Sequence, residues 1–80
     1  MKFRIVINRS ESAVRNFVHY GAITEKAGGG YTKIMIPHNP TKLKLIYADL
    51  TKAFPTASIY VSRIWDWGRV DTINTSYLKM

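Results

Sequence analysis

The spacing of apolar residues changes several times along this chain, and these changes constrain its fold more than any other feature. From Leu43 to Phe54 apolar residues recur every three or four positions, which is typical of the buried stripe of a helix. Asn39-Pro40 precedes this stretch and predicts its start, because asparagine caps free backbone N–H groups and proline fits the first helical turn. Pro55 predicts its end.

The N-terminal part of the chain predicts a strand followed by a shorter helix. Residues 2–7 alternate between polar and apolar positions, which is the pattern of a half-buried strand. Ser10 or Ser12 is expected to cap the helix that follows, and Gly21 is expected to end it. The apolar stripe of this helix consists of Ala13, Val14, Phe17 and Val18.

Glycines in the middle of the chain predict a hairpin. Residues 22–26 and 31–36 favour strands, and the glycine-rich segment 27–30 between them tolerates the positive φ of a tight turn. Residues 58–64 are rich in β-branched and aromatic side chains and predict another strand. In an alternative interpretation, the first helix runs through Lys26 and the sheet has three strands.

The expected order is therefore strand, helix, strand, strand, helix, strand. This order predicts an α+β fold of the ferredoxin-like βαββαβ type, with one antiparallel sheet and two helices on one of its faces. All 80 residues are expected to form a single domain. The tail, residues 65–80, is expected to pack on or beside the sheet, with residues 70–73 either a short fifth strand or a segment over the sheet edge.

The composition predicts the cellular compartment and the chemical class of the binding partner. The chain has no cysteine, no signal peptide and no apolar run long enough to span a bilayer, so we expect a cytoplasmic protein without membrane contact. Twelve lysines and arginines face five acidic residues, which gives a formal net charge of +7. Such a balance attracts polyanions and predicts a nucleic-acid partner.

The alternation of strand residues predicts which side chains lie on the sheet face that the helices leave open. If Phe3, Ile5, Ile7, Ile23, Ile34, Ile36, Ile59 and Val61 point toward the helices, the other face carries four cations, two tyrosines and none of the acids. Cations neutralise phosphates, and aromatic rings stack on unpaired bases. The expected residues of this face are Lys2, Arg4, Val6, Thr24, Lys26, Tyr31, Lys33, Met35, Tyr60 and Ser62.

This layout resembles the RNA-recognition motif, which also binds RNA on the open face of a βαββαβ sheet. The resemblance covers the order of elements over residues 2–64. The aromatic signature of that family is absent from residues 2–7, and residues 31–36 offer one usable ring, Tyr31. No binding residue is carried over from the family.

We therefore expect a non-enzymatic, RNA-binding accessory protein, either a monomer or a homodimer. The same face has other interpretations: it is solvated, buried in a dimer, or covered by Trp65, Trp67 and Tyr77 of the tail. The residues expected to bind nucleic acid are Lys2, Arg4, Lys26, Tyr31, Lys33, Tyr60, Arg63 and Arg69.

No motif indicates catalysis, a metal or a cofactor. Histidine is a common acid–base catalyst, but the spacing of His19 and His38 does not bring them together for such chemistry. The segment Gly28-Gly29-Gly30 lacks the spacing of a phosphate-binding loop, and a hairpin turn explains it.

An alternative function is that of a protein-interaction inhibitor or adaptor. Compact, basic, cysteine-free chains look like small phage-encoded proteins that disable host defence enzymes, including RNA-dependent toxins. The partner would then be an acidic protein or a ribonucleoprotein, bound directly or through an RNA bridge. The Trp65-Asp66-Trp67 segment discriminates between the two functions, because an exposed tryptophan suits a protein partner.

Overall fold

The computed structural model describes residues 1–18 and 21–78. Within them, the chain has a mixed α+β fold in which five strands form one antiparallel sheet, accompanied by two α-helices and a short 3₁₀ helix. The strands are β1 (Lys2–Ile7), β2 (Ile23–Gly28), β3 (Tyr31–Pro37), β4 (Ile59–Ile64) and β5 (Val70–Ile73). The helices are α1 (Glu11–Arg15), α2 (Pro40–Ala53) and the 3₁₀ helix η1 (Thr75–Leu78). The predicted α+β class is confirmed.

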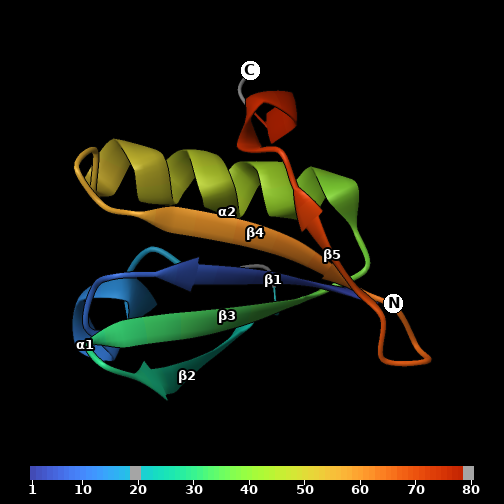
Figure 1. The fold of residues 1–80 in the computed structure, drawn as a ribbon. Helices are drawn as coiled ribbons and strands as arrows, with labels where there is room; N and C mark the ends of the chain where they lie inside the picture. The colour runs from blue at the N-terminus through green and yellow to red at the C-terminus, as the bar shows by residue number, and fades with distance from the viewer. Residues whose placement is uncertain (19–20, 79–80) are drawn as a thin grey trace.

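The sheet is built around its first strand. Its order is β2-β3-β1-β4-β5, and β1 pairs along its whole length with both β3 and β4 (Figure 1). Residues on opposite strands that pair directly point to the same face, so the register assigns every strand residue to a face. This assignment decides which of the expected binding residues lie together.

The glycine hairpin forms as predicted. Strand β2 pairs with β3, and the two are joined at Gly29-Gly30, whose φ angles are 60° and 83°. Positive φ at both central positions is the geometry that lets a two-residue turn match the twist of its strands. The alternative interpretation, with a helix running through Lys26 and a three-stranded sheet, is therefore wrong.

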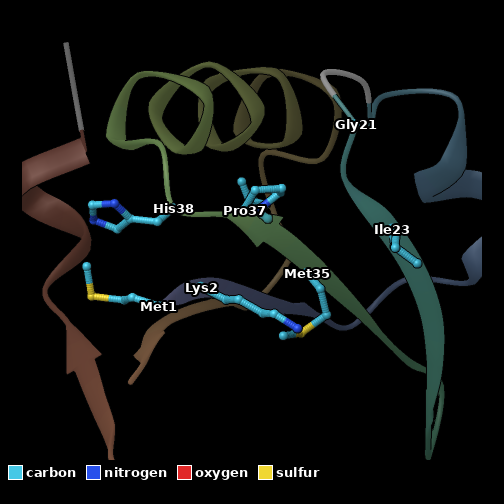
Figure 2. Close-up of a pocket in the computed structure, with 8 residues that line it drawn as sticks. Met1, Lys2, Gly21, Ile23, Met35, Pro37 and His38 are labelled. Carbon is cyan, nitrogen blue, oxygen red and sulfur yellow. The ribbon is translucent and has the colours of Figure 1, made fainter. Parts of the chain in front are cut away.

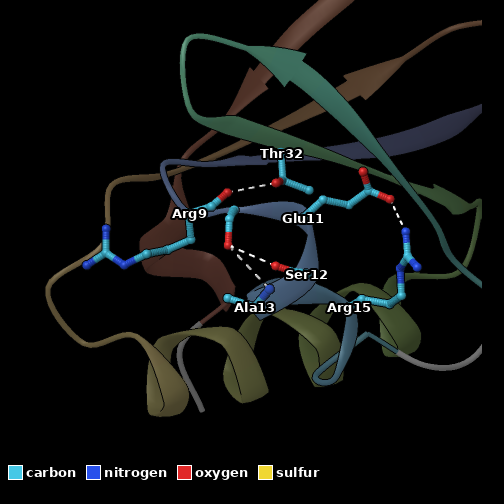
Figure 3. A network of polar contacts seen from close by, with 7 residues as sticks. Arg9, Glu11, Ser12, Ala13, Arg15 and Thr32 are labelled. Atoms are coloured by element: carbon cyan, nitrogen blue, oxygen red, sulfur yellow. Dashed lines mark hydrogen bonds and ion pairs between the residues drawn. The ribbon is translucent and has the colours of Figure 1, made fainter.

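Helix α1 is shorter than its apolar stripe predicts. Ser10 caps it, with its Oγ accepting from the backbone N–H of Ala13, and Glu11 pairs with Arg15 one turn later (Figure 3). The helix ends at Arg15 because the N–H of Phe17 bonds to the carbonyl of Val14 in a tighter turn. Gly21 has a φ of 78° but lies well beyond Arg15, where the helix ends, so the expectation that it ends the helix is wrong.

Helix α2 matches its sequence signals. The side chain of Asn39 accepts a hydrogen bond of 3.1 Å from the N–H of Lys42, Pro40 occupies the first turn, and Pro55 follows the end. The four residues of its stripe are buried against the sheet. They are Leu43, Ile46, Tyr47 and Leu50.

The core lies between the helices and one face of the sheet. Its strand residues all share one alternation parity, so both helices cover the same face, which we call the helix face. Thr32 is the buried polar residue on this face, and its hydroxyl donates a 2.7 Å hydrogen bond to the carbonyl of Arg9 (Figure 3). The buried apolar residues are Phe3, Ile5, Ile7, Val14, Ile34, Ile36, Leu43, Ile46, Tyr47, Leu50, Val61 and Leu78.

The tail extends the sheet and then turns back to the helices. Strand β5 pairs with β4 at the sheet edge, and η1 lies beside α2, where it buries Leu78 (Figure 1). Trp67 and Tyr77 are 72% and 77% exposed. As far as Leu78, the tail therefore does not cover the other face of the sheet, which we call the open face. No helix in the described part of the chain is long and apolar enough to cross a membrane.

Candidate nucleic-acid interface

The open face is a shallow, mixed surface of cations, rings and aliphatic side chains. The register puts residues of all five strands on it. The pairs Met35–Arg4 and Arg4–Ser62 form its central row. The strand residues of the open face are Lys2, Arg4, Val6, Ile23, Glu25, Gly28, Tyr31, Lys33, Met35, Pro37, Tyr60, Ser62, Ile64, Val70 and Thr72.

Five of the eight residues expected to bind nucleic acid share this face. Lys2 and Arg4 come from the central strand, and Lys33 lies opposite Val6 on β3. Tyr31 and Tyr60 are 38% and 57% exposed, so both rings are accessible to solvent. The structure thus brings together three cations and two rings on one surface.

The other three expected binding residues do not share this face. Lys26 pairs with the buried Thr32 and therefore belongs to the helix face. Arg63 pairs with Phe3, also on the helix face. Arg69 lies in the β4–β5 turn, where its Nε donates a 3.1 Å hydrogen bond to Asp71. The sequence-based face assignment is wrong for Lys26, and Arg63 and Arg69 do not extend the open basic surface.

A β-bulge explains the error in β2. Gly28 pairs with Tyr31, whereas Lys26 pairs with Thr32, so Ala27 is an extra residue in the ladder. One extra residue reverses the alternation of the rest of the strand. Thr24 therefore points to the helix face, and Ile23 points to the open face with 61% of its surface exposed. Gly28, with a φ of 80°, was the available signal, because one class of bulge places glycine there.

The same reversal brings an acid to the open face. Glu25 pairs with Lys33 in the ladder, and Nζ of Lys33 lies 3.4 Å from Oε2 of Glu25. The expectation that the face carries no acid is wrong. Lys33 is therefore partly neutralised, and the charge of Lys2 acts on the carboxylate of Asp66, whereas Arg4 has no carboxylate partner among the ion pairs of the described residues.

Arg4 is the most constrained cation of the open face. It lies in the middle of the central strand, flanked by Met35 and Ser62, and its side chain is partly buried. Its Nε–H is buried and has no hydrogen-bond partner within the described chain. Such a donor costs about 1–3 kcal/mol when it stays unpaired. Arginine suits an incoming oxyanion through the outer nitrogens of its guanidinium, because this fork of donors matches phosphate geometry.

One end of the open face is hollowed. A groove of about 220 Å³ lies between β2, β3 and the N-terminus, and Figure 2 shows its walls. Lys2 is the charged residue of its lining, and the rest is mostly apolar, including Ile23, Met35 and Pro37. The groove therefore suits an apolar group more than a phosphate.

The β4–β5 turn holds both tryptophans. Their rings stack with centroids 5.2 Å apart, and the indole N–H of Trp65 donates a 2.7 Å hydrogen bond to Asp71. This hydrogen bond, followed by the one from Arg69, holds the pKa of Asp71 below its usual value. The N-terminal amine pairs with Asp66 and lowers the pKa of that carboxyl in the same way. Trp65 is partly buried, and Trp67 is exposed.

Of the two histidines, the structure describes His38. The ring of His38 stacks on Phe3 with centroids 5.3 Å apart, and His19 lies outside the described residues. Among residues 1–18 and 21–78, no three side chains of the metal-ligating types come together.

Comparison with known proteins adds no family to this description. No protein-family model matches the chain, and none of the curated proteins matches its sequence.

Proposed function

We propose that this protein is a non-enzymatic, RNA-binding accessory protein that contacts single-stranded RNA with its open face. The observation that carries the proposal is the position of Arg4: a cation at the centre of the open face, with no carboxylate partner among the ion pairs of the described residues. Lys2 lies on the same strand and face, and Lys33 lies on the neighbouring strand. Together they offer a track of positive charge to a phosphate backbone.

The rings give the proposed site its preference for unpaired bases. Tyr60 pairs with Val6, two residues along β4 from Ser62 of the central row. Lys33 pairs with Val6 from the other side, so the exposed ring of Tyr60 is close to the cations. Tyr31 lies on β3, two residues from Lys33. Stacking on such rings contributes about 1–3 kcal/mol per base and is tolerant of sequence. Binding is therefore expected to depend strongly on salt and weakly on sequence.

We further propose that residues 2–64 have the ferredoxin-like arrangement of the RNA-recognition motif. The element order and the strand order β2-β3-β1-β4 support this assignment. Because the fold hosts many functions, it adds to the proposal only the location of the site.

The first experiment measures fluorescence anisotropy of labelled single-stranded RNA, single-stranded DNA and duplex DNA with the full chain. Each nucleic acid is titrated at several salt concentrations. We expect the tightest binding to a single strand, with log affinity falling by about 0.7 per phosphate contact for each unit of log salt. Absence of binding to all three at low salt would refute the proposal.

A second candidate function, that of a protein-interaction inhibitor or adaptor, is favoured by large apolar side chains that are exposed to solvent. Ile23 is 61% exposed, Val70 is 48% exposed, and both belong to the open face. Trp67 is 72% exposed at the adjacent turn, and large exposed aromatics are typical of binding hot spots.

Tryptophan substitution separates this candidate from the first. Trp67→Ala removes a ring that contacts Trp65 but leaves the open-face cations unchanged. We expect the substitution to leave RNA affinity within about twofold of the wild type, since Trp67 lies outside the charge track. A large loss of RNA affinity would mean that the turn belongs to the nucleic-acid interface. Capture of an acidic protein by the wild type but not by Trp67→Ala would support the second candidate.

A further inference from the structure

A second cavity lies on the helix face, away from the proposed RNA site. It has a volume of about 370 Å³ and lies between the start of α2, strands β4 and β5, and η1. The buried residues Phe3, Leu43 and Leu78 form its apolar floor. Arg63 and Lys44 line it as cations, and Tyr77, which is 77% exposed, lies at its rim.

Arg63 is held in place by rings rather than by a carboxylate. Its guanidinium carbon lies 5.8 Å from the ring centroid of Phe3 and 5.4 Å from that of Trp65. Arginine stacks on aromatic faces in this way and keeps its charge. The stacked position limits the motion of the guanidinium, which is the preorganisation that an anion receptor needs.

The charge of Arg63 is not neutralised by an ion pair among the described residues. Asp71 lies opposite Arg63 in the β4–β5 ladder, and the charge of Arg63 acts on its carboxylate, but the two oxygens of Asp71 accept their hydrogen bonds from Trp65 and Arg69. The Nε–H of Arg63 is buried and has no hydrogen-bond partner in the described chain. Arg63 also lines the cavity, so its charge lies beside an apolar floor.

We propose that this cavity binds a small aromatic oxyanion, an aromatic ring that carries a carboxylate or a phosphate. The apolar floor takes the ring, and Arg63 and Lys44 take the oxyanion. Pockets for small ligands share this composition: a mostly apolar lining with a few charged groups that fix the orientation. The site lies on the opposite face from Lys2, Arg4 and Lys33, so it is independent of the proposed RNA site.

The test is an NMR titration of the ¹⁵N-labelled full chain. The Nε–H signal of Arg63 and the backbone amides of Lys44, Ile73 and Leu78 report on the cavity. The probes are benzoate, phenyl phosphate, benzyl alcohol and inorganic phosphate. We expect benzoate or phenyl phosphate to shift these signals saturably, and the tighter of the two identifies the oxyanion. Benzyl alcohol and inorganic phosphate are expected to bind at least tenfold more weakly, because each lacks one half of the ligand.

Substitutions assign the two cations. Arg63→Gln is expected to weaken binding of the preferred anion at least tenfold, because it removes a charged hydrogen-bond donor. Lys44→Gln, on an exposed side chain, is expected to weaken it severalfold without disturbing the packing of Phe3 and Trp65. Lys52→Gln, in the last turn of the same helix and outside the cavity, is the matched control and is expected to bind as the wild type does.

Three results would overturn the proposal. The first is the absence of saturable shifts with either anion. The second is equal binding of benzoate and benzyl alcohol, which would remove the role of the charge. The third is unchanged affinity in both Lys44→Gln and a folded Arg63→Gln. None of these results would bear on RNA binding by the open face.

Discussion

Glu25 and Lys33 form an ion pair on the open face, with Nζ of Lys33 3.4 Å from Oε2 of Glu25. Both side chains are exposed enough for solvent to screen the pair, so its contribution to stability is small. Its effect on binding is larger, because the carboxylate lies within the track of Lys2, Arg4 and Lys33. A phosphate that approaches Lys33 must displace Glu25 or be repelled by it.

Glu25→Gln is therefore expected to raise the affinity for single-stranded RNA by about two- to fivefold at low salt, the range that a screened ion pair allows. The measurement is fluorescence anisotropy with a labelled strand. Glu11→Gln is the matched control, since it changes the net charge equally but lies on α1, where Glu11 pairs with Arg15. An equal gain in both variants would mean that only the net charge matters.

The register of β2 on β3 predicts that two isoleucines contribute very differently to the free energy of unfolding. Ile34 is fully buried, and Ile34→Ala is expected to cost about 2–5 kcal/mol of the free energy of unfolding. Ile23→Ala is expected to change it by no more than about 0.5 kcal/mol, because Ile23 is on the open face. Urea unfolding measures both. A large loss from Ile23→Ala would contradict the register of β2.

Acid is expected to loosen the β4–β5 turn. The indole N–H of Trp65 and the guanidinium of Arg69 favour the ionised form of Asp71, so its pKa in the folded state is below the ordinary value of 3.8. A lowered pKa means that the stabilisation is present above pH 3.8 and is lost as the pH falls through the lowered value.

Urea midpoints followed by tryptophan emission between pH 7 and pH 2 test this dependence. In Asp71→Asn, the decline in the midpoint below pH 3.8 is expected to be shallower than in the wild type. Asp66→Asn is a parallel variant, because Asp66 owes its lowered pKa to the N-terminal amine rather than to the turn. Identical acid limbs for Asp71→Asn and the wild type would count against a role for the Trp65–Asp71 hydrogen bond.

Much of the fold follows from local signals in the sequence. The Asn39-Pro40 start and the apolar stripe of α2 predict that helix, and the alternation of β1, β3 and β4 predicts their faces. These elements were predictable because their apolar periodicity is long and uninterrupted. The face of Arg63 was predictable too, since it has the parity of Val61.

The rest depends on details that periodicity does not encode. One extra residue at Ala27 reverses β2, which moves Lys26 away from the proposed site and brings Glu25 to it. The early end of α1 depends on two i→i−3 hydrogen bonds, from Phe17 to Val14 and from Val18 to Arg15. The ring contacts of Arg63 join residues of β1, β4 and the following turn, so only the tertiary structure reveals them.

The central claim is that the cations of the open face, rather than the net charge of the chain, bind RNA. Two triple variants test it: Lys2→Gln/Arg4→Gln/Lys33→Gln on the open face, and Lys42→Gln/Lys44→Gln/Lys52→Gln on α2. Each removes three positive charges and lowers the formal net charge from +7 to +4. Circular dichroism and thermal unfolding confirm that both are folded before binding is measured.

The decisive measurement is the salt dependence of RNA affinity in these two variants. We predict that the open-face variant loses most of its affinity and that its log–log salt slope falls by about 2, the share of three phosphate contacts on a single strand. The α2 variant should keep a slope close to that of the wild type. Equal slopes and equal affinities in the two variants would contradict the account.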